Sequence, residues 1–120
     1  DITCPMVAAK IKELNADYTR IEANNQGSGF IRLLRQSVQE DKVLSIKNTA
    51  NKHTRILMAY HIIKNKFVYV HPEKQTDEYR AMMQQIYEYK KDGKSKHDDA
   101  PDAMAGLANF IQALLPHIFE

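Results

Sequence analysis

Apolar side chains recur along the chain with two different spacings, which predict two kinds of element. A spacing of about 3.6 residues predicts five helices, over residues 5–15, 29–39, 48–66, 76–90 and 99–115. Alternating or short apolar runs predict three strands, over residues 17–23, 43–46 and 66–71. Because strands alternate with helices, the pattern predicts an α/β fold with some parallel strand pairing.

Composition narrows the class of protein. The chain has 120 residues, of which 43% are hydrophobic and 27% charged, so it can bury one modest core. Its single cysteine, Cys4, excludes an internal disulfide, and the five histidines lack the spacing of a zinc site. No apolar run reaches the ~18 residues of a membrane helix, and the N-terminus lacks a signal-peptide layout. We therefore expect an intracellular, soluble protein whose net charge of +2 does not by itself indicate a polyanion partner.

Three aspartates crowd the start of the last predicted helix, in the stretch KSKHDDAPDAMAGLANFIQALL. If Asp99 is the N-cap, Asp102 is the third helical residue, and both could serve only to cap the helix and interact with its dipole, each contributing ~0.5–1 kcal/mol. A cap needs only one or two carboxylates, however, and Asp98 and Asp102 lie one turn apart on the same face. A bound divalent cation such as Mg²⁺ would relieve the repulsion among the three. Both interpretations stay open on the pattern alone.

A second acidic position stands at the end of a predicted strand. Glu22 directly precedes the turn-forming stretch NNQGSG, at the carboxyl end of the first strand. Open α/β sheets bind their ligands at this edge, which makes Glu22 a candidate site residue. The alternative is an exposed strand glutamate that pairs with Arg20. The two acidic motifs together favour a shared site.

These motifs resemble a known family. ADYTRIEANNQGSGFIRLL resembles the strand, glutamate and Asn/Gly turn of the nuclease domain in tailed-phage terminase large subunits, and HDDAPDAMAGLA resembles that family's carboxylate-rich last motif. NKHTRI and NKFVYVHP resemble its Lys/Arg helix and the following strand. The resemblance implies a ribonuclease H-like mixed sheet flanked by helices, and a metal-dependent endonuclease that cuts concatemeric viral DNA during genome packaging. Holliday-junction resolvases and other ribonuclease H-like nucleases share a similar final motif and remain an alternative.

The resemblance also implies roles for individual residues. Glu22 and Asp99 would be ligands of Mg²⁺ or Mn²⁺, and Asp98 and Asp102 either further ligands or orienters of bound water in two-metal catalysis. The implied partners are double-stranded DNA, the portal protein and the small terminase subunit, in the cytoplasm of a bacterial host and without a membrane. Basic residues that either contact DNA phosphates or form ordinary solvated surface are Lys52, Arg55, Lys64, Lys66, Lys90, Lys91, Lys94 and Lys96.

Two features of the family are missing from the sequence. The family's opening-strand aspartate has no counterpart, because Asp1 lacks an apolar strand around it and Asp41 lies in a predicted turn. No phosphate loop of an ATPase motor is present either. We therefore expect residues 1–120 to form a single nuclease-like domain, the C-terminal portion of a larger protein, that cuts DNA slowly or not at all by itself. A non-catalytic α/β interaction domain, whose aspartates only cap a helix, is the other alternative.

Overall fold

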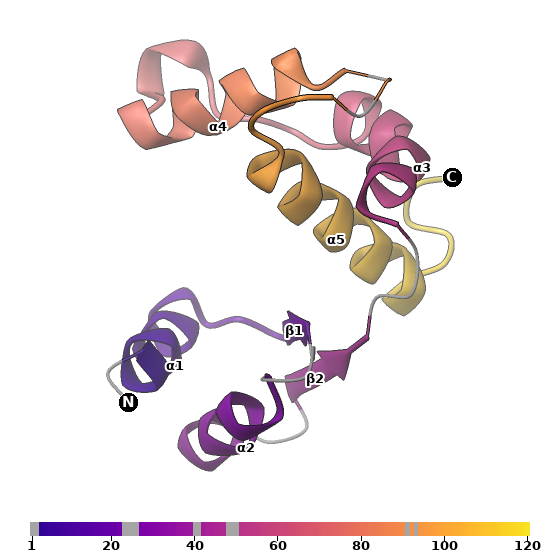
Figure 1. The fold of residues 1–120 in the computed structure, drawn as a ribbon. Helices are drawn as coiled ribbons and strands as arrows, with labels where there is room; N and C mark the ends of the chain where they lie inside the picture. The colour runs from indigo at the N-terminus through magenta and orange to yellow at the C-terminus, as the bar shows by residue number, and fades with distance from the viewer. Residues whose placement is uncertain (1–2, 23–26, 40–41, 48–50, 91, 93) are drawn as a thin grey trace. The chain divides into compact units, whose positions relative to one another are not determined.

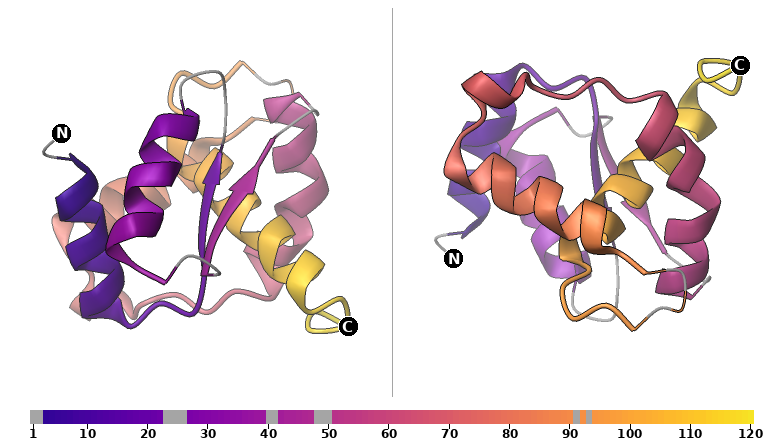
Figure 2. Two further views of the ribbon diagram at one scale, coloured as in Figure 1. Left: turned by 90° about the horizontal axis from the view of Figure 1, so that it is seen from below. Right: turned by 90° about the horizontal axis from the view of Figure 1, so that it is seen from above.

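A computed structural model of residues 1–120 describes the whole chain except residues 1–2, 23–26, 40–41, 48–50, 91 and 93 (Figures 1 and 2). The chain divides into two compact units, Asp1–Thr49 and Ala50–Glu120, here called the N-terminal and the C-terminal unit. The elements of the N-terminal unit are α1 (Thr3–Leu14), β1 (Thr19–Glu22), α2 (Gly27–Ser37) and β2 (Val43–Ile46). Those of the C-terminal unit are α3 (Lys52–Asn65), a 3₁₀ turn (Pro72–Lys74), α4 (Asp77–Glu88) and α5 (Asp99–Leu114).

The N-terminal unit is a parallel strand pair covered by two helices. Thr19 of β1 lies opposite Val43 of β2, and Glu22 lies opposite Ile46. Helix α1 ends at Leu14, and the following Asn15 has a φ of 49°, the left-handed conformation found after many helix C-termini. The core of this unit joins both helices to β2 and consists of Cys4, Ala8, Ile31, Leu34 and Val43. This packing leaves Glu22 exposed at the carboxyl end of its strand, where the sequence predicted it.

Residues 66–71, predicted as a third strand, form no strand in the part of the chain that the structure describes. The backbone here is bonded by side chains instead of by a neighbouring strand. The Val70 N–H donates to Tyr79 Oη at 3.0 Å, and the Val70 carbonyl accepts from Gln75 Nε2 at 2.7 Å. These two bonds satisfy the N–H and the carbonyl of Val70 without a neighbouring strand. The fold is mixed α/β as predicted, but the sheet among the described residues has two strands, fewer than the resemblance implies.

The C-terminal unit is built on the contact between α3 and α5. Its core consists of Ile56, Ala59, Ile62 and Ile63 from α3 with Ala105 and Ala108 from α5. Both alanines of α5 are fully buried, and Gly106 is also buried, so the small side chains let the two helices approach closely. Helix α4 packs against α5 as well. Within the described residues, no helix combines the length and the apolar character needed to cross a membrane.

Candidate functional site

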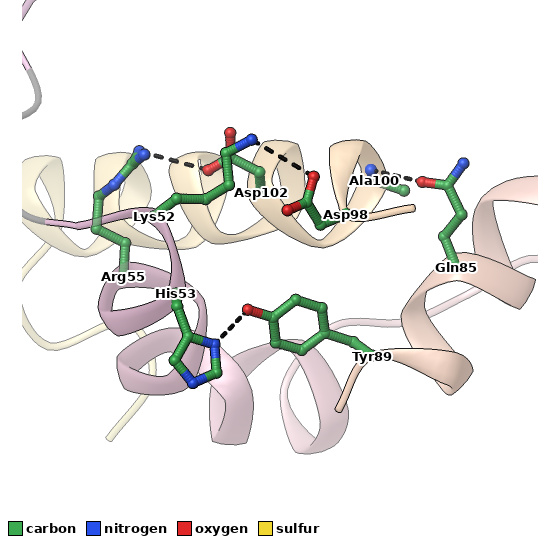
Figure 3. A network of polar contacts seen from close by, with 8 residues as sticks. All are labelled: Lys52, His53, Arg55, Gln85, Tyr89, Asp98, Ala100 and Asp102. Carbon is green, nitrogen blue, oxygen red and sulfur yellow. Dashed lines mark hydrogen bonds and ion pairs between the residues drawn. The ribbon is translucent and has the colours of Figure 1, made fainter. Parts of the chain in front are cut away.

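The aspartate cluster lies at the start of α5, where Asp98 is the N-cap and not Asp99 as predicted. The Asp98 side chain makes no capping hydrogen bond, because its backbone (φ −123°, ψ 7°) is not in the extended conformation typical of a capping residue. The backbone N–H of Ala100 donates instead to Oε1 of Gln85 on α4, at 2.9 Å (Figure 3). The Asp102 amide donates to the Asp98 carbonyl at 2.9 Å. The Asp98 carboxylate therefore bonds no backbone amide of the first turn of α5.

Two basic side chains of α3 face two of the carboxylates. Lys52 Nζ lies 3.4 Å from Asp98 Oδ1, and Arg55 Nη1 lies 3.4 Å from Asp102 Oδ1 (Figure 3). The i,i+3 spacing of the two cations matches the i,i+4 spacing of the two anions, since both spacings place residues on one face of a helix. The sequence left the roles of Lys52 and Arg55 open, and the structure pairs both with the cluster.

The two ion pairs differ in burial. The side chains of Lys52 and Asp98 are 45% and 34% exposed, whereas those of Arg55 and Asp102 are 15% and 25% exposed. The Arg55–Asp102 contact joins opposite charges but lacks hydrogen-bond geometry. As a result, Arg55 Nε and Asp102 Oδ1 are buried without a hydrogen-bond partner among the described residues. Leaving such a group unbonded costs ~1–3 kcal/mol, so Asp102 Oδ1 is an acceptor that a further ligand would satisfy.

The donor set fits a hard divalent cation in chemical type. Asp98, Asp99 and Asp102 offer carboxylate oxygens, which Mg²⁺ and Mn²⁺ prefer, and one of those oxygens is a buried, unbonded acceptor. The Asp99 side chain is exposed and, among the described residues, forms no hydrogen bond or ion pair. In their present arrangement, however, no three metal-ligating side chains of the described residues come together. The residues suit a metal ion, while Asp98 and Asp102 are turned toward the cations of α3.

A histidine and a tyrosine that sequence reasoning did not single out lie beside the cluster. His53 Nδ1 and Tyr89 Oη share a hydrogen bond of 2.5 Å, with ring centroids 5.7 Å apart (Figure 3). Burial raises the pKa of the Tyr89 hydroxyl above its ordinary value of 10.0, and the negative charge of Asp98 adds to the rise. This bond fixes the end of α4 against the first turn of α3. No local pattern marks these residues, because each acts through a partner more than 30 residues away.

The other predicted site residues belong to different parts of the chain. Glu22 belongs to the N-terminal unit and the aspartates to the C-terminal unit, so their common site stays a prediction. Lys64 lies over the ring of Tyr60, with Nζ 5.6 Å from the centroid. Three positions weighed above, Asp1, Asp41 and Lys91, fall outside the described residues.

Comparison with known proteins gives one match. The model of the family described as the terminase RNaseH-like domain matches residues 2–109. The matched range includes Glu22, Lys52, Arg55 and all three aspartates of the cluster. No curated protein and no solved structure matches the chain.

Proposed function

This chain belongs to the terminase RNaseH-like domain family, and we propose that it is the metal-dependent nuclease domain of a phage terminase large subunit. In this proposal the domain has the ribonuclease H-like fold that the family implies and cuts concatemeric viral DNA during genome packaging. The observation that carries the proposal is the start of α5. There Gln85 bonds the Ala100 amide, so no carboxylate of the cluster is needed to bond it. Asp98 and Asp102 face Lys52 and Arg55, and Asp99 is exposed.

Each acidic residue has a proposed role. Asp99, exposed in the first turn of α5, is a metal ligand together with Glu22. Asp98 and Asp102 are further ligands or orient water, and Asp102 Oδ1 is buried without a hydrogen bond although it faces Arg55 at 3.4 Å. Two bound Mg²⁺ or Mn²⁺ ions would activate a water and stabilise the charge of the leaving oxygen. The chain's own contribution is to hold the three aspartates on one short stretch at the start of α5 and Glu22 at the end of β1.

The proposed substrate is double-stranded DNA, and the proposed assembly partners are the portal protein and the small terminase subunit. Phosphate contacts fit the exposed lysines of the C-terminal unit, Lys64, Lys66, Lys90, Lys94 and Lys96. Such contacts give affinity that falls with salt and carries little sequence preference. We therefore expect cutting without strong sequence specificity.

Plasmid nicking by the complete terminase large subunit that carries this domain tests the proposal. Asp99→Ala and Glu22→Ala should each abolish Mn²⁺-dependent nicking while DNA binding and the folded structure persist. Asp77→Ala is the matched control, because Asp77 opens α4 as Asp99 opens α5, with its side chain 99% exposed. The control should cut like the wild type. Undiminished, chelator-sensitive cutting by Asp99→Ala and Glu22→Ala would show that the active site lies elsewhere.

A further inference from the structure

The two cations that face the aspartates have different roles in metal binding. We infer that Lys52 is an exchangeable counter-ion of the cluster, whose ammonium neutralises Asp98 in the metal-free protein and leaves when a divalent cation binds that carboxylate. Arg55 stays paired with Asp102 and holds the cluster in place. This inference rests on the proposed metal-dependent function and concerns how the site accepts its ion.

The positions of both cations are unfavourable for α3 itself. Lys52 and Arg55 lie in the first turn of α3, which contains no acidic residue. Positive charge at a helix N-terminus opposes the helix dipole, and the two cations also repel each other. Their placement is explained by what they face, since the first turn of α5 presents Asp98 and Asp102 at 3.4 Å from them. The pairs therefore stabilise the carboxylate cluster at the expense of α3.

Burial separates the two roles. Lys52 is the first residue of α3, its side chain is 45% exposed, and its ammonium is strongly hydrated and carried on a flexible stem. An exposed pair of this kind is weak and corresponds to a change of up to about fivefold in an equilibrium constant. Arg55 is only 15% exposed, with its Nε buried, so its guanidinium cannot leave without exposing a packed side chain. A divalent ion would displace the lysine at low cost and leave the arginine in place.

Calorimetric titration of the metal-free chain with Mn²⁺ tests the exchange. Lys52→Gln should bind Mn²⁺ about twofold to fivefold more tightly than the wild type, because the competing ammonium is gone. Lys64→Gln is the matched control: it removes the same charge from the same helix, 12 residues further along, where the lysine lies over Tyr60. The control should change the affinity much less. Equal affinities of Lys52→Gln and Lys64→Gln, or weaker binding by Lys52→Gln, would overturn the inference.

A second variant tests the role of Arg55. Arg55→Gln should weaken Mn²⁺ binding although it also removes a positive charge, since Asp102 loses the side chain that holds it. Tighter binding by Arg55→Gln would overturn the division of roles between the two cations. Thermal melts followed by circular dichroism establish that each variant is folded before titration.

The outcomes separate this inference from the proposed function. If the wild type binds Mn²⁺ and Lys52→Gln binds it no better than the control, only the exchange is refuted. If neither the wild type nor any variant binds Mn²⁺, the exchange is refuted as well, and the nicking assay on the complete large subunit decides the proposed function separately.

Discussion

Alanine substitution at three helix N-caps of the C-terminal unit tests whether the Asp98 carboxylate stabilises the fold. Asn51 caps α3 by accepting from the Thr54 amide at 3.2 Å, and Thr76 caps α4 by accepting from the Tyr79 amide at 3.1 Å. Asp98 occupies the same position at α5 and makes no such bond. The three variants therefore compare two residues whose side chains cap a helix with one N-cap residue whose side chain pairs with Lys52 instead.

The expected losses follow from these contacts. Asn51→Ala and Thr76→Ala should each lower the free energy of unfolding by about 1 kcal/mol, the usual contribution of an N-cap. Asp98→Ala loses a half-exposed pair with Lys52 and a favourable dipole interaction, each ~0.3 kcal/mol. It gains ~0.2–0.5 kcal/mol from the removed repulsion with Asp102, one turn away. The net change at Asp98 should lie within about 0.5 kcal/mol of zero.

Urea unfolding in the presence of a chelator measures these differences, with metal excluded so that binding does not add to stability. The small remaining loss in Asp98→Ala should shrink further at high salt, which screens the exposed pair. A loss at Asp98 equal to that at Asn51 or Thr76 would refute the reasoning. It would mean that the Asp98 carboxylate caps α5 in solution.

Two further changes test the packing around the site. Burial and the charge of Asp98 raise the pKa of Tyr89 above 10.0. The free energy of unfolding should therefore be constant up to about pH 10 and fall as the pH rises toward the folded-state pKa. Tyr89→Phe should lose less of this free energy at alkaline pH, as measured by urea unfolding across the same pH range. Ala108→Leu should lower the free energy of unfolding by ~1–3 kcal/mol, since Ala108 is fully buried in the contact with α3. Ala103→Leu, on the exposed face of α5, should change it by less than ~0.5 kcal/mol, and equal effects of the two leucines would contradict the packing.

The sequence correctly predicted those elements that are determined by residues close together in the chain. Strand β2 has the predicted bounds, Val43–Ile46, and α5 begins at the predicted Asp99, because apolar periodicity and first-turn residues are read within a few positions. The prediction of a strand over residues 66–71 was wrong, because a strand depends on more than local sequence. The alternation in this segment indicates an extended backbone, but a strand also needs a neighbour, and pairing depends on residues elsewhere in the chain.

The candidate site likewise has features that the sequence predicts and features that depend on tertiary packing. Residue types and spacing identified the acidic cluster and Glu22, since carboxylates at a helix start and at a strand end are visible in the sequence. What the sequence could not supply was the partner of each side chain. Gln85 bonds Ala100 from 15 residues away, and Lys52 reaches Asp98 from 46 residues away. Such contacts depend on how α3, α4 and α5 pack, and that packing follows from the whole core.

The glutamine that bonds the start of α5 makes stability and chemistry separable at this position. Gln85, on α4, satisfies the Ala100 amide that an aspartate would otherwise have to bond. The exposed Asp99 can therefore be exchanged for a neutral residue without unfolding the helix that carries it. Under the proposed function, a single substitution at the exposed Asp99 should therefore give a domain that keeps its fold and its basic surface but does not cut DNA. Such a variant would bind DNA without cutting it and allow the steps before cleavage to be studied.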